Sequence, residues 1–189
     1  MKQYERPTHY GKIFRGAPGN EDGEKWFFNQ IKEDIDVIYD VGASDNSIFV
    51  DFTGEVHYFE PTERIHALKK RANHNKKSHW NDFGLSNVTA SDRDVTWETG
   101  GVIPLKDGSC KYTDSPEMTK MNAITGEDYL KEVGQETVDF LKIDTEGHEL
   151  DIIKGFGERI KDVNIIQFEY SGINWAMNIG MMDLINHLQ

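Results

Sequence analysis

Apolar positions along the chain fall into two patterns, short β-branched runs and stripes at helical spacing. The change between them is sharpest after Val138–Ile143, where the polar stretch Asp144–Gly147 interrupts the run. A short apolar run of this kind is typical of a strand buried on both faces of a parallel sheet. Apolar residues then recur at helical spacing up to Phe156, and Gly157 supplies a stop signal. The segment therefore predicts a strand, a tight acidic turn and a helix.

The same alternation of strand and helix patterns extends along most of the chain. It predicts an α/β fold with a mostly parallel sheet flanked by helices. Further strands are expected at Val37–Val41, Val56–Phe59, Ser78–Leu85 and Asn164–Glu169, and a short helix or turn at Ile48–Phe52. Helices are expected around Trp26–Ile35 and at Thr62–Ala72, Ile124–Val133 and Met181–Leu188. Thr62 is expected to cap the second of these helices.

The stretch between Ser86 and Met121 shows the least regular pattern. The sequence predicts a hairpin with strands at 88–90 and 95–97, followed by a mobile loop at 100–116. Residues 1–23 contain several glycines and prolines and are expected to form an arm, with one domain over 24–189. A helix after the fifth strand normally leads to further sheet, so either the chain is part of a longer multidomain protein or its sheet is minimal.

Length, charge and cysteine content narrow the class of protein. The 189 residues suit one domain, and they contain one cysteine, which excludes an internal disulfide and is compatible with a reducing, cytoplasmic compartment. The formal net charge of −12 disfavours nucleic acid and anionic membranes as partners. The sequence has no apolar run long enough for a membrane span and no secretory signal at its N-terminus.

The ends of the first two strands carry the features of a nucleoside site. Gly42 ends the first strand, where the absence of a Cβ allows a ligand to approach. Glu60 ends the second strand, twenty residues beyond Asp40, and an acidic residue there can accept hydrogen bonds from ribose hydroxyls. This arrangement serves both dinucleotides and S-adenosylmethionine, so the acid alone does not identify the cofactor.

The loop after the first strand favours S-adenosylmethionine. A dinucleotide fingerprint requires three glycines, whereas the loop here has one, Gly42. Asp45 would repel a diphosphate but suits the sulfonium and ammonium groups of S-adenosylmethionine, as does Asp40. A purely structural turn, with Asp40 paired to Lys142, is the alternative. The residues expected to surround the cofactor are Asp40, Gly42, Ala43, Ser44, Asp45, Glu60 and Pro61, with Asp82 and Phe83 at the adenine end.

Several motifs together resemble those of the FkbM-type methyltransferase family, over about residues 35–189. The resemblance implies a class I methyltransferase (Rossmann-like) fold, S-adenosylmethionine as methyl donor and a hydroxyl acceptor, often on a sugar. Asn46 stands where the family usually has a second glycine, the first crossover is short, and the last two strands of that fold are absent from this chain. The matching motifs are Asp40–Ala43, Phe59–Pro61, Phe140–Glu149 and Ile165–Glu169.

Methyl transfer to an alcohol requires a group that aligns the hydroxyl and accepts its proton. Parallel pairing would bring Asp40, Asp144 and Glu169 to one sheet edge, with Glu146 and His148 on the turn above. Asp144 and His148 are the two candidates for the base, Asp144 for its position and His148 for its ordinary pKa range. Lys142 lies in a buried strand and is expected to pair with a carboxylate such as Asp40 or Glu169, with substrate contact as the alternative.

Two further features of this edge remain open from the sequence. Asp144, Glu146, His148 and Glu169 could hold a hard divalent cation, although their spacing matches no recognised metal motif. Aromatic residues could stack on a sugar ring or simply pack in the core. These aromatic residues are Trp97, Tyr112, Tyr170 and Trp175.

The sequence thus predicts an S-adenosylmethionine-dependent O-methyltransferase that acts on a small-molecule or glycan hydroxyl. Two alternatives stay open. One is a binding or scaffold module that keeps a degenerate cofactor fold, for which Asn46 and the short sheet are the support. The other is an NAD-type oxidoreductase, which the single glycine and Asp45 disfavour.

Overall fold

The chain divides into two compact units, residues 1–36 and 37–189. In the first unit, helix α2 spans Gly23–Ile31 and buries Phe28 and Ile31. The helical stripe expected to run to Ile35 therefore ends earlier, and residues 1–22 of the expected arm lie outside the described part. The computed structural model describes residues 23–72, 75–96, 102–104, 110–112, 118–170 and 172–188, with backbone only at 91–96, 102–104, 110–112, 118–120, 173 and 176.

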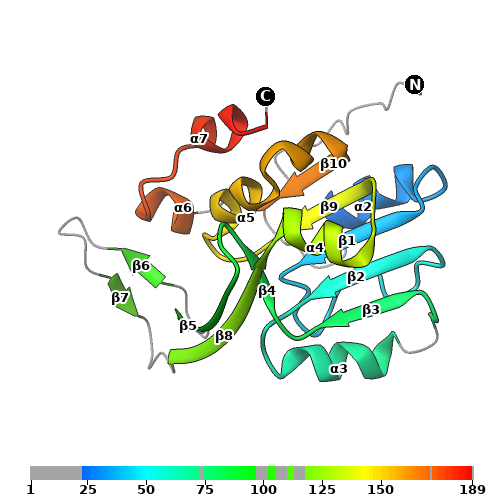
Figure 1. Cartoon of the computed structure of the whole chain (residues 1–189), viewed down its shortest axis with the longest axis horizontal. Helices are drawn as coiled ribbons and strands as arrows, with labels where there is room; N and C mark the ends of the chain where they lie inside the picture. The colour runs from blue at the N-terminus through cyan, green and yellow to red at the C-terminus, as the bar shows by residue number, and fades with distance from the viewer. Residues whose placement is uncertain are drawn as a thin grey trace. The chain divides into compact units, whose positions relative to one another are not determined.

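The second unit contains a five-stranded sheet in the order β10-β9-β1-β2-β3, in which every pairing is parallel (Figure 1). This confirms the predicted α/β class and the Rossmann-like arrangement of a parallel sheet flanked by helices. The observed bounds agree with the predicted strands to within a residue, except for β3. The strands are β1 (Val37–Val41), β2 (Glu55–Phe59), β3 (Ser78–Asn81), β9 (Val138–Ile143) and β10 (Val163–Phe168).

The helices of this unit follow the predicted stripes but are shorter. Thr62, the predicted cap of α3, lies one residue before the observed N-cap residue, Glu63. The Thr62 hydroxyl accepts a hydrogen bond from the Arg64 N–H at 3.3 Å and donates one to Glu60. The segment 48–52 is a turn. The helices are α3 (Arg64–Arg71), α4 (Gly126–Val133), α5 (Glu149–Phe156), the 3-10 helix η1 (Gly157–Asp162), α6 (Gly172–Ala176) and α7 (Met181–Asn186).

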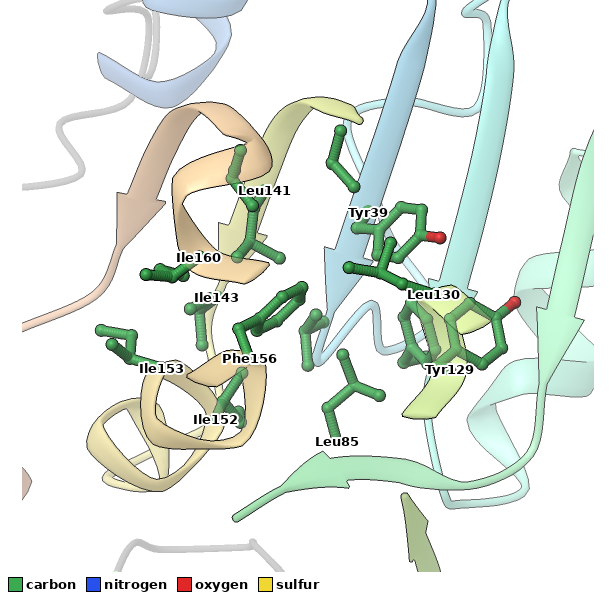
Figure 2. Close-up of a cluster of buried hydrophobic side chains, with 14 of the residues drawn as sticks. Tyr39, Leu85, Tyr129, Leu130, Leu141, Ile143, Ile152, Ile153, Phe156 and Ile160 are labelled. Atoms are coloured by element: carbon green, nitrogen blue, oxygen red, sulfur yellow. The ribbon is translucent and has the colours of Figure 1, made fainter. Parts of the chain in front are cut away.

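The main core lies between one face of the sheet and helices α4 and α5 (Figure 2). Because neighbouring residues of a strand point to opposite faces, β1 sends Tyr39 and Val41 into this core and Asp40 to the other side. Phe156 of α5 is fully buried against Gly126 of α4, where an added Cβ would lie 2.5 Å from its ring. The two helices are therefore packed closely enough to fix the start of α5, which follows the acidic turn.

The region between β3 and α4 differs most from the prediction. The single strand expected at 78–85 is two strands, β3 and β4 (Gly84–Ser86), and β4 pairs with β8 (Met118–Thr125) in a separate three-stranded sheet. The hairpin expected at 88–97 is one strand, β5 (Ala90–Thr96), antiparallel to β8. β5 lies at the edge of that sheet, where charged residues are tolerated. Because this strand contains several charged residues, its sequence resembled that of a turn.

Part of the loop expected at 100–116 forms strands. Strands β6 (Val102–Pro104) and β7 (Cys110–Tyr112) form an antiparallel pair, and the remaining residues of that segment lie outside the described part. Among the residues that the structure describes, no helix is long and apolar enough to cross a membrane.

Candidate active site

The carboxyl ends of β1, β9 and β10 bring together the acidic residues that the sequence predicted there. The Asp144 N–H donates to the Val41 carbonyl at 2.9 Å, and the Glu169 N–H donates to the Ile143 carbonyl at 2.9 Å. These bonds continue the parallel ladders by one step beyond each strand. Asp144 and Glu169 therefore lie beside each other at the edge where ligands bind in sheets of this type.

Three carboxylates converge at this edge. Asp144, Glu146 and Glu169 each place one oxygen so that all three oxygens lie within 4.8 Å of one another. Burial, followed by the charges of Asp144 and Glu146, raises the pKa of Glu169 from 4.5 to about 7. A carboxyl group with this pKa exchanges its proton near neutral pH, which is the property required of a general base or acid. The convergence is compatible with a bound cation, but carboxylates also gather in this way without one.

Lys142 pairs with Asp144. Its ammonium lies 2.9 Å from Asp144 Oδ2, and the lysine is buried, so the predicted ion pair is confirmed. Asp144 was not among the partners that the sequence suggested, Asp40 and Glu169. It lies two residues further along the chain, just beyond the end of β9, and the Lys142 charge also acts on Asp40, its register partner on β1. A buried cation at this distance stabilises the Asp144 carboxylate and orients it.

The turn between β9 and α5 is held by a residue to which the sequence analysis gave no role. Glu149 is fully buried, and its Oε1 accepts from the Thr145 N–H, the Thr145 hydroxyl and the Gly147 N–H at 3.0–3.1 Å. Its Oε2 accepts from Asn174 of α6. Glu146 and Gly147 both have positive φ, 53° and 105°. Glu149 thus fixes a sharp turn that presents Asp144 and Glu146, and its only sequence signal was the acid at the start of a helix.

His148, one of the two candidates for the base, is engaged elsewhere. Its Nε2 lies 3.0 Å from the Ser86 hydroxyl, and its Nδ1 lies 3.7 Å from Asp151 Oδ2. Ser86 is buried at the end of β4, and its carbonyl oxygen lies 2.0 Å from the Cβ that any side chain at Gly155 would add. His148 therefore helps to dock α5 against β4, and it is not among the three side chains that converge at the acidic edge.

The loop after β1 is shaped by backbone hydrogen bonds to β2. The N–H groups of Gly42 and Ala43 both donate to the Phe59 carbonyl, at 2.9 and 3.1 Å. Gly42 has φ +82°, and a Cβ there would lie 1.9 Å from the Asp144 carbonyl oxygen. The glycine is therefore required by the close approach of the β9 turn, and its role at a cofactor stays a prediction.

Glu60 closes the same loop from β2. Its Oε2 accepts from the Ser44 N–H at 2.9 Å, and its Oε1 accepts from the Thr62 N–H at 3.1 Å and from the Thr62 hydroxyl. The side chain is buried, and Ser44 has φ +52°. Since each carboxylate oxygen has two lone pairs, Oε2 keeps the capacity to accept one more hydrogen bond. Pro61, which follows it, is half-buried.

Asp40 is a deeply buried acid near the carboxyl end of β1. Its exposed fraction is 1%, and neither carboxylate oxygen has a hydrogen-bond partner of good geometry among the described residues. Burial raises its pKa, while the charge of Lys142 and the Ser47 hydroxyl oppose the shift. A buried carboxylate without such partners is costly unless a cationic or donor group reaches it.

The charge around the loop is mixed. Asp45 is exposed, and its carbonyl accepts a hydrogen bond from Arg71 of α3. Arg64, also from α3, lies 3.3 Å from the Ser44 hydroxyl. The repulsion of a diphosphate by Asp45 is therefore offset by two nearby arginines, and the acidic character of the site rests on Asp40 and Glu60 instead.

The residues expected at the adenine end lie in the turn between β3 and β4. Asp82 is exposed, and the half-buried Phe83 contacts the rings of Phe59 and Tyr129 at centroid distances of 6.1 and 6.0 Å. Of the four aromatic residues expected near an acceptor, Trp97 and the side chain of Tyr112 lie outside the described part. The Tyr170 hydroxyl donates to the Ile179 carbonyl at 3.2 Å, and Trp175 is 77% exposed.

Comparison with known families decides the class of protein. The model of the methyltransferase FkbM domain matches residues 40–188, which include the β1 loop, Glu60, the acidic turn and Glu169. The chain belongs to the FkbM methyltransferase domain family. Searches of curated proteins and of solved structures gave no match. The predicted family and fold are thereby confirmed, and the chain is a methyltransferase by family, a class that generally uses S-adenosylmethionine.

Proposed function

We propose that this FkbM-family protein is an O-methyltransferase that uses S-adenosylmethionine to methylate a hydroxyl group of a sugar or glycan. The observation that carries the proposal is the Glu169 carboxyl group. It lies beside Asp144 at the carboxyl edge of the sheet, and its pKa is raised to about 7. An alcohol acceptor needs a base that exchanges a proton near neutral pH. A carboxylate with an ordinary pKa is a weaker base and accepts that proton less readily.

The donor set at the β1 and β2 ends fits a cationic cofactor. Asp40 is a buried carboxylate without a well-placed partner among the described residues, and it suits an ammonium or sulfonium group better than a phosphate. Glu60 Oε2 has a free lone pair for a ribose hydroxyl. The cofactor, when bound, supplies an electrophilic methyl group on its sulfonium. We place it against Asp40, the 42–45 loop and Glu60, with the Asp82–Phe83 turn at the adenine end.

The chain's own residues would then handle the acceptor. In its ionised form, Glu169 accepts the proton of the acceptor hydroxyl as the oxygen becomes nucleophilic. Asp144, held by Lys142, accepts a hydrogen bond from the acceptor and fixes its orientation. A sugar suits this edge because its neighbouring hydroxyls can donate to several carboxylate oxygens that lie within 4.8 Å of one another.

The acceptor part of the proposal is tested with methyl-labelled S-adenosylmethionine and a panel of sugars, simple alcohols, amines and thiols. We expect label in sugar hydroxyls, at least a hundredfold less in the Glu169→Gln variant, and nothing comparable in amines or thiols. Transfer to amines or thiols alone would contradict O-methylation. Cofactor binding without transfer to any acceptor would favour a scaffold role.

The cofactor part is tested separately through Glu60. The Glu60→Gln variant should bind S-adenosylmethionine at least tenfold more weakly, because the amide NH₂ cannot accept the bonds from Ser44 or Thr62. Glu63 is 94% exposed on its side chain and lies three positions away in the sequence, so Glu63→Gln is the matched control and should bind normally. Equal affinity of the two variants would remove Glu60 from the cofactor site.

A further inference from the structure

A second group of metal-ligating side chains lies on β2 and β3, toward the opposite end of the strands from the acidic edge. Glu55 and His57 are two residues apart on β2 and point to the same face of the sheet. His79 is the register partner of His57 on β3, so it projects from that face as well. One ligand atom from each of the three residues lies within 4.8 Å of the other two.

The three ligand atoms converge on one point. The Nε2 atoms of His57 and His79 lie 2.9 and 3.0 Å from the same oxygen, Oε1 of Glu55. The two imidazole rings are stacked, with centroids 4.1 Å apart and an angle of 5° between their planes. Ligand atoms around a tetrahedral zinc ion lie about 3.3 Å from one another. The two nitrogen–oxygen separations are close to this value. The stacked rings must turn relative to each other for both Nε2 lone pairs to reach one ion, and His79 is the exposed ring that can turn.

A chain of hydrogen bonds behind His57 supports the same use. The Asn81 side-chain N–H donates to the Tyr58 carbonyl at 3.0 Å, which turns Asn81 Oδ1 toward Tyr129. The Tyr129 hydroxyl donates to this oxygen at 3.3 Å and lies 2.8 Å from His57 Nδ1. When the Tyr129 hydroxyl gives its proton to Asn81, it can accept a hydrogen bond from His57 Nδ1–H.

This chain is satisfied by the His57 tautomer that carries its proton on Nδ1. With the proton on Nδ1, the Nε2 lone pair faces the Glu55 carboxylate oxygen at 2.9 Å. Without a cation, a proton on Nε2 donates to that oxygen instead, so a bound cation would take the place of this proton between the two atoms. Metal-bound histidines commonly donate their other ring N–H in this way, and that outer bond orients the ring.

The group is also open to solvent on one side. His57 is fully buried, but the side chains of His79 and Glu55 are 45% and 35% exposed. A cation can therefore enter from the surface, and water can supply a fourth ligand. Two imidazoles with one carboxylate suit zinc and its neighbours in the first transition row better than magnesium or calcium, which prefer oxygen ligands alone.

We propose that Glu55, His57 and His79 form a binding site for one late first-row divalent cation, with Zn²⁺ as the representative ion. The bound cation would link β2 to the edge strand β3. The site stands apart from the proposed chemistry of the protein, because it uses none of the residues that converge at the acidic edge.

The test is a titration of the full chain, first stripped with a chelator, with Zn²⁺ and with Co²⁺ as a spectroscopic probe. We expect one ion per chain and the intense visible absorption of tetrahedral Co²⁺, displaced by Zn²⁺. His79→Ala should weaken binding at least tenfold, and Glu55→Gln should do the same while leaving the buried His57 in place.

The matched control is His66→Ala. His66 is another exposed histidine beside a glutamate, with its Nε2 3.5 Å from Glu63 Oε2, but it does not belong to the group formed by Glu55, His57 and His79. This variant should bind like the wild type. Absence of stoichiometric binding in the wild type would overturn the proposal. So would binding that survives His79→Ala but is lost in Glu146→Gln, since that result places the ion at the acidic edge.

Discussion

The backbone at Gly42 faces the carbonyl oxygen of Asp144 so closely that a Cβ at residue 42 would lie 1.9 Å from that oxygen. This contact joins the loop after β1, where we place the cofactor, to the turn after β9, where we place the acceptor. The close approach of these two segments therefore requires a glycine at residue 42.

Replacing Gly42 with alanine should disturb this contact. The clash with Asp144 adds to the strain of φ +82°, so we expect the free energy of unfolding to fall by about 2–4 kcal/mol. Gly134→Ala is the control, because Gly134 also has positive φ but no described atom lies within 4 Å of an added Cβ. That variant should lose only about 1 kcal/mol. Urea denaturation followed by circular dichroism measures both, and equal losses would show that the contact is unimportant.

Glu149 should be the acid on which the acidic turn depends. Glu149→Gln leaves the Thr145 and Gly147 N–H groups facing an amide, and we expect a loss of about 2–3 kcal/mol in the free energy of unfolding. Glu158→Gln removes an exposed acid that pairs with Lys161 and should leave stability nearly unchanged. The same denaturation assay compares them. A Glu149 variant as stable as the Glu158 control would contradict its role in the turn.

The raised pKa of Glu169 predicts how stability depends on pH. The folded protein holds this proton up to about pH 7, whereas the unfolded chain releases it near 4.5. The folded state therefore binds more protons between these values, so this stabilising contribution is complete below pH 4.5 and is lost as the pH rises through 7. Glu169→Gln cannot ionise, so its stability relative to the wild type should increase from pH 5 to pH 8. Unfolding measured at several pH values tests this, and a constant difference would show that the pKa is ordinary.

Much of this site follows from the sequence because strand order brings strand ends together. The apolar run before Asp144 and the acid at 169 were enough to predict that the two residues meet, since parallel neighbours end at one edge. The pairing of Lys142 with Asp144 depends on side-chain rotation, which the sequence does not show. The contact of His148 with Ser86 depends on β4, a strand that the sequence did not separate from β3. The pairing of His57 with His79 depends on the register between β2 and β3, which no local pattern encodes.

Asp144 should affect catalysis more than cofactor binding. We expect Asp144→Asn to lower turnover at least a hundredfold, because the amide cannot replace the carboxylate that Lys142 holds toward the acceptor. The dissociation constant for S-adenosylmethionine should stay within about tenfold, roughly 1.4 kcal/mol. Turnover assays and calorimetry on the same preparation separate the two effects. Unchanged turnover would remove Asp144 from the mechanism, and a large loss of affinity would move it to the cofactor site.

The central claim is that the carboxylates at the ends of β1 and β2 form a site for a cationic methyl donor. Calorimetric titration of the wild-type chain with S-adenosylmethionine, with its demethylated product and with NAD, each with and without Mg²⁺, tests this claim most directly. We predict micromolar binding of the first two and no binding of NAD. Binding of NAD alone, or of none of the three, would contradict the claim.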